Sequence, residues 1–275
     1  MPANAFAPAC PGQGIQIMNI NRQLTHHSWS AVAALDKREG VVILPLGAVE
    51  QHGHHLPLLT DTLIVNRMLE AALGALPDEV AAWALPTLPY GNSNEHTGFP
   101  GTISLSAQTL MTVLHDIARS LAGADFRRRA FLNGHGGNNA LLEVMAREIR
   151  AATGLLCFCL QPALFMEPPF TISDEERRLG FHGGELETSL LLTIAPQLVD
   201  LEKAVRHYAN FPETDTPLFF FGAAASAWLS RDWSENGIFG DATLGTAEKG
   251  DALIAASGAR LADLLRVIST FETAR

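Results

Sequence analysis

The stretch VVILPLG at residues 41–47 is short, apolar and partly β-branched, and it ends in glycine. A run of this kind predicts a strand that is buried on both faces, as in a parallel sheet covered by helices. Thr60-Asp61 follows and predicts the start of a helix over residues 62–73, where apolar residues recur at helical spacing. The chain therefore begins its ordered part with a strand and a helix, as expected of an α/β fold.

The same alternation continues along the rest of the sequence. We predict strands at residues 80–85, 129–133 and 155–160, and helices at residues 107–122, 138–152, 185–194 and 246–271. Strands that alternate with helices favour a three-layer α/β/α sandwich around a mainly parallel sheet. Because the sequence has no internal repeat and no linker-like segment, residues 15–275 are predicted to form one domain after an Ala/Pro/Gly-rich lead-in at residues 1–14.

Composition and charge argue against several classes of protein. Of the 275 residues, 47% are hydrophobic, which is enough to bury a large core, and the formal net charge is -10. An acidic chain without a basic stripe is a poor candidate for binding nucleic acid or an anionic membrane. The one dense basic run, Arg127-Arg128-Arg129, is expected to be a solvated helix-to-strand turn.

The sequence also predicts the cellular compartment. No apolar run approaches the ~18 residues that span a bilayer, and residues 1–14 lack the basic and apolar regions of a signal peptide. Cys10, Cys157 and Cys159 cannot close a disulfide framework, and the last two are expected to be buried small hydrophobes on one face of a strand. We therefore expect a soluble protein of the reducing cytoplasm.

The first cluster of chemically versatile side chains, Glu50-Gln-His-Gly-His-His55, begins just beyond the first predicted strand, and Asp61 follows it. Glu50 and His52 are two positions apart, so they point the same way in an extended segment. A carboxylate and an imidazole that converge in this way form half of a site for a first-row metal ion, which Asp61 could complete by bridging. The alternative is a polar loop whose Asp61 only caps a helix. Two further histidines are expected to line or support the site: His54 and His55.

The second cluster, Asn133-Gly-His-Gly-Gly-Asn-Asn139, directly follows the strand predicted at residues 129–133. Its glycines allow tight turns and a close approach of the backbone to a ligand, and they present His135 at the strand end. One alternative is a purely structural histidine. Another is a phosphate-binding loop, but the cluster fits neither a Walker loop nor the G-x-G-x-x-G fingerprint.

The third cluster, His182-Gly-Gly-Glu-Leu-Glu-Thr-Ser189, places a histidine and two carboxylates at the start of a strongly apolar helix. Glu185 and Glu187 could simply stabilise the positive end of the helix dipole. Burial of the following residues argues instead that this helix end points inward, where a carboxylate needs a partner. Motifs of other hydrolases are missing, since the sequence has no G-x-S-x-G, H-E-x-x-H or C-x-x-C.

Together, these clusters resemble the creatininase (creatinine amidohydrolase) family. The matching motifs occur in the family's order within residues 41–201: residues 44–57 with Asp61, Tyr90-Gly91 with Phe99-Pro-Gly-Thr102, Asn133-Gly-His-Gly-Gly-Asn138, and His182-Gly-Gly-Glu-Leu-Glu-Thr-Ser189. The resemblance implies an α/β/α sandwich and two divalent metal ions per chain, zinc together with zinc, manganese or iron. It also implies amide hydrolysis and a homo-oligomer, frequently a hexamer.

The resemblance also implies a set of metal ligands. Glu50, Asp61 and His135 would bind one ion, and His52 would bind the other together with a bridging Asp61. In creatininase itself, a further carboxylate lies two residues after the histidine of the N-G-H motif, where this sequence has Gly137. We assign Glu185 as the replacement ligand, with Glu187 as the second choice.

His182 matches the catalytic histidine of the family, and substrate contacts are expected from Gly136, Gly137 and Phe181. The backbone N–H groups of the two glycines could stabilise an oxyanion. Creatininase carries tryptophans in the loop before the catalytic histidine, whereas residues 175–181 contain none and Phe181 replaces a polar neighbour. This difference argues against creatinine as the substrate.

The function predicted from the sequence is that of a binuclear metal-dependent amidohydrolase of small molecules. A hydroxide that bridges the two metal ions would attack the carbonyl of a cyclic amide or formamide, and His182 would donate a proton to the leaving nitrogen. The alternatives are a metal-dependent hydrolase of a lactone or cyclic sugar derivative, and a non-catalytic ligand-binding protein. Metal content and product analysis would separate the three.

Overall fold

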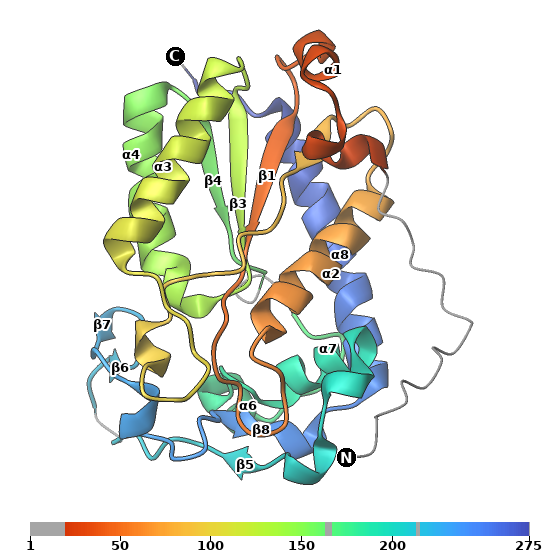
Figure 1. Ribbon diagram of the computed structural model, residues 1–275. Helices are drawn as coiled ribbons and strands as arrows, with labels where there is room; N and C mark the ends of the chain where they lie inside the picture. The colour runs from red at the N-terminus through yellow and green to blue at the C-terminus, as the bar shows by residue number, and fades with distance from the viewer. Residues whose placement is uncertain (1–19, 163–166, 213–214, 275) are drawn as a thin grey trace, which may run out of the picture.

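The strand predicted at residues 41–47 is β1, Val41–Leu46, an inner strand of a four-stranded parallel sheet. The computed structural model describes residues 20–162, 167–212 and 215–274. The strand order is β2-β1-β3-β4, and the other three strands are β2 Ala82–Ala84, β3 Arg128–Asn133 and β4 Leu156–Leu160. Leu46 pairs with Asn133, so the carboxyl ends of β1 and β3 lie side by side (Figure 1).

Helices alternate with these strands along the chain. The α-helices are α1 Trp29–Ala34, α2 Thr60–Ala75, α3 Ala107–Gly123, α4 Asn139–Thr153, α6 Asp174–Leu179, α7 Glu185–Ile194 and α8 Ala247–Thr270. Short 3-10 helices are η1 Ile20–Arg22, η2 Leu24–His26, η3 Asn94–His96, η4 Gly136–Asn138, η5 Pro196–Leu198, η6 Leu201–Lys203, η7 Ser230–Asp232 and η8 Ala242–Leu244. Helices α3 and α8 begin where they do because the hydroxyls of Ser106 and Thr246 accept hydrogen bonds from otherwise unpaired backbone N–H groups.

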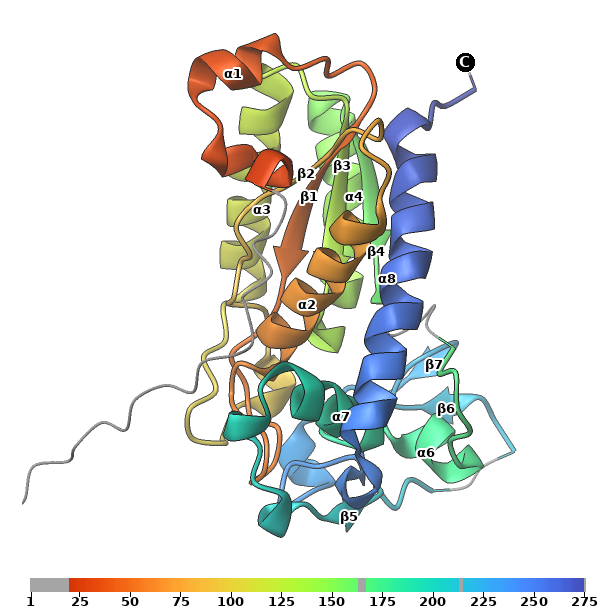
Figure 2. The same ribbon diagram turned by 90° about the vertical axis from the view of Figure 1, so that its right-hand side faces the viewer.

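Helices cover both faces of the sheet, with α2 and α8 on one side and α3 and α4 on the other (Figure 2). Val41 and Ile43 of β1 belong to the apolar core beneath α2 and α8. Val42 and Leu44 point to the opposite face and belong to the core beneath α3 and α4. The predicted three-layer α/β/α sandwich around a parallel sheet is therefore confirmed.

The described chain between β4 and α8 forms a layer of short elements beyond the carboxyl ends of the strands (Figure 1). β5 Arg206–His207 pairs with β8 Gly240–Asp241, and β6 Leu218–Phe219 pairs with β7 Ala224–Ala225. Aromatic side chains pack together in this layer: Phe181, Phe211, Phe219, Phe220, Phe221, Trp228, Trp233 and Phe239. The sequence periodicity did not predict these elements because each is too short to show a period.

The expectation that Arg127-Arg128-Arg129 forms a solvated turn is wrong for its last two residues. Arg128 is 1% exposed and Arg129 is 0% exposed, because both belong to β3. The Arg128 guanidinium donates to the carbonyl oxygens of Phe271 and Arg38 and pairs with Glu272. Arg129 donates to the carbonyl of Leu114 and stacks on the ring of Phe131. These hydrogen bonds and the ring contact offset part of the cost of burial, although Nε and Nη2 of Arg129 have no hydrogen-bond partner in the described structure.

Several predictions from the sequence concern residues outside the described ranges. The lead-in at residues 1–14 and Cys10 are among them, and the boundaries of a single domain at residues 15–275 stay a prediction. Within residues 20–162, 167–212 and 215–274, none of the helices has the length and apolar character required to span a bilayer. Cys157 and Cys159 are free thiols that pack at the edge of the core beneath α3 and α4, close to the environment predicted for them.

Candidate metal centre

The polar clusters meet where the order of the strands reverses. The chain goes from β1 to β2 on one side and then returns to β3 on the other side of β1. Such a reversal leaves an opening beyond the carboxyl ends of β1 and β3. Glu50 and His52 follow β1, and His135 follows β3 by two residues. Asp61 lies in the first turn of α2 and is 2% exposed. The topology therefore gathers residues that are far apart in the sequence.

One group of three possible ligands surrounds the Nδ1 atom of His135. The Oε2 atom of Glu50 lies 3.2 Å from this nitrogen, and Oδ2 of Asp61 lies 3.3 Å from it. Both carboxylate oxygens are buried and have no hydrogen-bond partner in the described structure. Two buried oxygens without partners, aimed at one imidazole nitrogen, fit a divalent cation.

A second group forms around the Nε2 atom of His52. The Oδ1 atom of Asp61 lies 3.2 Å from it, and Oε2 of Glu187 lies 3.9 Å from it. Asp61 thus presents one oxygen to each group. His52, His182 and Glu187 also have possible ligand atoms within 4.8 Å of one another.

Backbone carbonyls orient both histidines toward these groups. Nδ1 of His52 lies 3.1 Å from the carbonyl oxygen of Glu50, and Nε2 of His135 lies 3.1 Å from that of Asn92. A carbonyl only accepts, so each ring donates its remote N–H to the backbone. In the neutral ring, the other nitrogen of each histidine carries the lone pair that a metal ion needs, which is the usual arrangement of metal-binding histidines.

The structure does not bring Glu185 to either group. Its Oε1 atom lies 2.6 Å from Nζ of Lys249 in α8, and the carboxylate is 2% exposed. Glu187, two residues later, faces the centre and accepts a hydrogen bond of 2.6 Å from the backbone N–H of Gly183. Of the two candidates considered from the sequence, Glu187 has the position of a ligand.

His182 lies at the junction of the two groups. Its ring stacks on that of His52, with centroids 4.3 Å apart. Nε2 lies 2.7 Å from the carbonyl oxygen of Gln51 and donates to it, so Nδ1 carries the lone pair and faces Oε1 of Glu50 at 3.7 Å. Burial lowers the pKa of His182 well below its usual value, so the ring is neutral at pH 7.

Electrostatics make the centre suitable for cations. Burial disfavours a charged His52, but Asp61, Glu187 and Glu50 outweigh burial and raise its pKa to about 10. In turn His52 and His135 lower the pKa of Asp61 against the effect of burial. Burial raises the pKa of Glu187 to about 7. Buried anionic oxygens of this kind are stabilised by positive charge, which divalent ions supply more strongly than imidazolium rings.

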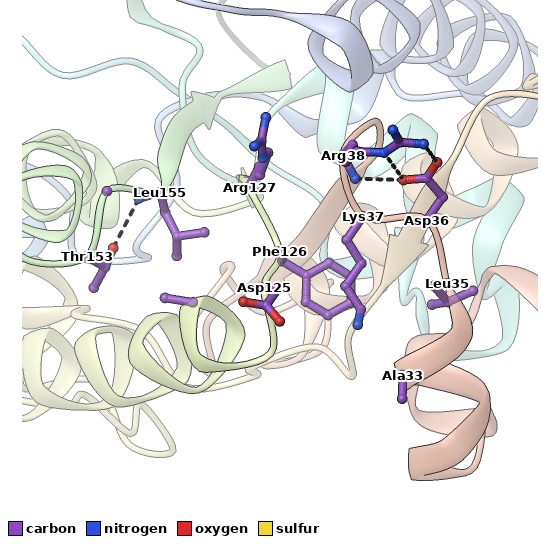
Figure 3. Close-up of a pocket in the computed structure, with 12 residues that line it drawn as sticks. Ala33, Leu35, Asp36, Lys37, Arg38, Asp125, Phe126, Arg127, Thr153 and Leu155 are labelled. Atoms are coloured by element: carbon purple, nitrogen blue, oxygen red, sulfur yellow. Dashed lines mark hydrogen bonds and ion pairs between the residues drawn. The ribbon is translucent and has the colours of Figure 1, made fainter.

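A separate surface cavity lies at the opposite end of the sheet, where the strands begin. Its lining includes Leu35, Lys37 and Phe126, together with Arg38 and Asp36, whose ion pair Figure 3 shows. None of the residues of the two ligand groups lines it. The chemistry argued from the sequence therefore does not belong to this cavity.

Comparison with known proteins shows the family of this chain. The family model "Creatininase: Creatinine amidohydrolase" matches residues 25–265. The chain belongs to the creatininase family.

Two relatives in the creatininase family differ in substrate. Creatinine amidohydrolase of Pseudomonas putida is 37% identical over 64% of this chain and 72% of its own length. The mycofactocin precursor peptide peptidase of Mycolicibacterium smegmatis is 37% identical over 78% of this chain and 80% of its own length. A more distant relative, the 3-dehydro-scyllo-inosose hydrolase of Thermotoga maritima, is 25% identical over 78% of this chain and 72% of its own length.

Solved creatininase structures contain metal ions. A manganese form superimposes with a TM-score of 0.70 at 28% identity, covering 89% of this chain and 97% of the other. A mutant of a Zn-Zn type gives a TM-score of 0.69 at 29% identity, covering 88% and 96%. The described chain is thus a creatininase-family metal-dependent hydrolase with candidate ligands for a binuclear site.

The residues expected to contact substrate (Gly136, Gly137, Phe181) and those expected to line or support the site (His54, His55) differ in exposure and in contacts. Gly136 is exposed and has open space beside it, whereas Gly137 is partly buried against Glu95 and His135. The ring of Phe181 stacks on Phe239, with centroids 4.8 Å apart, inside the aromatic cluster. His54 is exposed, and His55 supports α7 through a 2.9 Å contact between its Nε2 and the hydroxyl of Thr188.

Sequence reasoning missed three residues of the centre. Glu95 and His96 lie in η3, within the loop that carries the Tyr90-Gly91 and Phe99-Pro-Gly-Thr102 motifs, and Gln51 lies between the two ligands after β1. His96 is 3% exposed and Gln51 is 5% exposed. The adjacent carboxylate and imidazole at residues 95–96, which lie between the matched stretches Tyr90-Gly91 and Phe99-Pro-Gly-Thr102, were the available signal. A tryptophan does lie beside Phe181: Trp228 packs against its ring, although it comes from a later segment and not from the loop before His182.

Proposed function

We propose that this creatininase-family hydrolase holds two divalent metal ions and cleaves a C–N bond in a small amide, such as a cyclic amide or a formamide. The observation that supports this proposal best is the position of Asp61. Its Oδ2 lies 3.3 Å from Nδ1 of His135, and its Oδ1 lies 3.2 Å from Nε2 of His52. A buried carboxylate with one oxygen toward each ligand group is suited to bridge two ions.

Five side chains would hold the ions. One ion would take Glu50, Asp61 and His135, and the other would take His52, Asp61 and Glu187. When bound, two such ions supply a water of lowered pKa and polarise the carbonyl of the substrate. The related structures include a manganese form and a Zn-Zn form, which supports zinc with zinc or manganese here, and iron is the remaining alternative.

His182 would transfer the proton of the reaction. Its neutral ring has a lone pair on Nδ1, so it first accepts a proton from the attacking water. It then donates this proton to the leaving nitrogen, which is the general-acid role expected from the sequence. The Nε2–H bond to the Gln51 carbonyl keeps the ring oriented during both steps.

Residues at the mouth of the centre would contact the substrate. Gly136 lies in open space, so the backbone N–H groups of Gly136 and Gly137 are candidates for stabilising an oxyanion. Phe181 would act through the aromatic cluster as an apolar wall beside His182. A homo-oligomer, in particular a hexamer, stays a prediction that light scattering can test.

A second candidate is hydrolysis of a peptide. The peptidase of M. smegmatis shares 37% identity over a larger part of this chain than creatinine amidohydrolase does. The third alternative is a lactone or cyclic sugar derivative, because the relative from T. maritima acts on an inosose.

The test is a substrate screen on protein loaded with Zn²⁺ or Mn²⁺. Cyclic amides, formamides, short peptides and lactones would each be offered, and the products identified by mass spectrometry. Release of an amine, ammonia or formate from a formamide, or ring opening of a cyclic amide, supports the proposal, whereas cleavage of short peptides alone would favour the second candidate. Cleavage of lactones alone, or fewer than one bound metal ion per chain in metal-replete buffer, would contradict it.

A further inference from the structure

His96 lies beside the proposed metal ligands without belonging to the ligand set argued above. Its ring is 3% exposed, and its Nε2 lies 3.4 Å from Oε1 of Glu50. Glu50, His96 and His182 also have possible ligand atoms within 4.8 Å of one another, which resembles a site for a third ion. Whether His96 binds a metal or donates a hydrogen bond depends on which ring nitrogen carries its proton.

The side-chain amide of Gln51 decides this question, because two backbone groups fix its orientation. The N–H of Gly53 donates to Oε1 of Gln51 at 2.9 Å. Nε2 of Gln51 donates to the carbonyl oxygen of Gly237 at 2.9 Å. If the amide were turned by 180°, its NH₂ group would face the N–H of Gly53 and its oxygen would face the carbonyl oxygen of Gly237, and neither pair could form a hydrogen bond. Gly237 also has a positive φ of 80°, and a Cβ there would lie 1.9 Å from Oε1 of Gln51, so this approach requires glycine.

Among the described residues, the second proton of the Gln51 amide has one available acceptor. Nε2 of Gln51 lies 2.9 Å from Nδ1 of His96 and 3.0 Å from Nε2 of His182. The His182 nitrogen already donates to the Gln51 carbonyl at 2.7 Å, so it cannot accept. Nδ1 of His96 therefore accepts from Gln51, and the hydroxyl of Ser230, 2.9 Å away, can donate to the same nitrogen.

A histidine that accepts at Nδ1 carries its proton on Nε2. In His96 this nitrogen faces Oε1 of Glu50. The other oxygen of Glu50, Oε2, is buried without a hydrogen-bond partner and faces Nδ1 of His135 at 3.2 Å. The two oxygens of Glu50 thus face different groups, one a donor and the other an open ligand position.

We propose that His96 is a positioning residue that donates from Nε2 to Oε1 of Glu50 and so leaves Oε2 as a single ligand atom for the metal ion shared with Asp61 and His135. This inference rests on the two-metal function proposed above. It also explains why Glu50, His96 and His182 do not form a third metal site: a protonated Nε2 has no lone pair to offer. Through the Gln51 amide, which also donates to the carbonyl oxygen of Gly237, the loop at Gly237 takes part in fixing this ligand.

Two variants at residue 96 test the proposal. His96→Leu removes the donor, whereas His96→Gln can present an amide N–H near the same place. Partners of metal ligands typically account for about 10–100-fold in metal affinity. We expect His96→Leu to weaken binding of one Zn²⁺ ion by about that factor in competition with a chelator, and His96→Gln to recover most of the loss. Ser230→Ala is the control for a nonspecific loss of packing around His96. It leaves the contact between Gln51 and His96 in place, so this variant should bind both ions nearly normally.

The outcomes separate this inference from the function on which it rests. Wild-type protein with fewer than one ion per chain would contradict both. Two ions in the wild type with unchanged affinity in His96→Leu would contradict only the role of His96. Three ions in the wild type and two in both variants would make His96 a ligand.

A measurement on the wild-type protein tests the proposal even if the variants do not fold. Long-range ¹H–¹⁵N spectra of histidine-labelled, metal-free protein report which ring nitrogen is protonated. We expect His96 and His182 both to carry the proton on Nε2. A proton on Nδ1 of His96 would overturn the proposal.

Discussion

The carboxylate of Glu95 occupies the place that a side chain at residue 137 would take. A Cβ added to Gly137 would lie 2.1 Å from Oε1 of Glu95 and 2.5 Å from Nε2 of His135. Oε1 of Glu95 itself lies 3.5 Å from that nitrogen. Beside His135, the carboxylate therefore comes from residue 95, and residue 137 has to be small.

This relationship predicts that substitutions at the two positions are not additive. Gly137→Ala should destabilise the protein by about 1–3 kcal/mol through overpacking. In a Glu95→Ala background the same change should cost less, because one of its three close contacts is removed, although Asn92 O still lies 2.7 Å away. Denaturant unfolding of the two single variants and the double variant measures the coupling. Strictly additive changes would show that the two positions do not share this space.

Metal stoichiometry should distinguish the three acidic residues. Asp61→Ala is expected to lose both ions, because each of its oxygens faces a different ligand group. Glu187→Ala should lose or weaken one ion. Glu185→Ala is the matched control on the same helix: it removes only the contact with Lys249 and should keep two ions. Elemental analysis after gel filtration gives the counts, and a loss of metal in Glu185→Ala with none in Glu187→Ala would reverse our assignment.

His182 should affect rate more than metal binding. His182→Asn is expected to keep both ions and to lower kcat by ~10²–10⁴-fold, as for removal of a general acid–base. Activity on the substrate found by the screen and metal content would be measured on one sample. Loss of an ion would show that Nδ1 of His182 is a ligand, and an unchanged rate would leave the residue with a structural role.

Glu176 should be important for stability although it lies outside the centre. Its carboxylate accepts hydrogen bonds from the backbone N–H groups of Glu185 and Asp241 and from the hydroxyl of Tyr208. Glu176→Ala leaves these donors without an acceptor and should reduce the free energy of unfolding by at least about 2 kcal/mol. The neighbouring Glu175→Ala removes only an exposed ion pair with Arg206 and should change the free energy of unfolding by less than about 1 kcal/mol. Equal effects in thermal unfolding would contradict this role.

The two thiols on β4 should be unreactive in the folded protein. Burial raises the pKa of Cys157 and of Cys159 to about 11. The thiolate is the nucleophile, so at pH 8 only about a thousandth of each thiol would be in the reactive form. Iodoacetamide should modify neither residue in a Cys10→Ser variant until denaturant is added, as read by mass spectrometry. Rapid modification of the native variant at pH 8 would show that β4 is accessible.

The sequence by itself determined the order of the four sheet strands and of the longer helices, and most of the chemical types at the centre. Residues 41–47 had to form a buried strand because they are apolar without interruption. Glu50, His52 and His135 could be predicted as neighbours because each follows a strand, and the carboxyl ends of parallel strands meet at one edge. Asp61 could be predicted because it lies at the start of the next helix.

Only the tertiary structure decided which carboxylate of α7 faces the centre. Residues two apart on a helix point in directions about 200° apart, so Glu185 and Glu187 cannot face the same side. Sequence patterns do not reveal that Lys249 of α8 lies against one of them. The burial of Arg128 and Arg129 depends in the same way on carbonyls far along the chain, such as those of Phe271 and Leu114.

The network of Gln51, His96 and Ser230 was also beyond prediction from the sequence. Its members are separated by 45 and 134 positions and meet only when the layer of short elements packs against the strand ends. The proton position on His96 follows from which acceptors and donors this packing places around it. A motif can specify residue types, but a hydrogen-bond direction depends on the neighbours that the completed fold supplies.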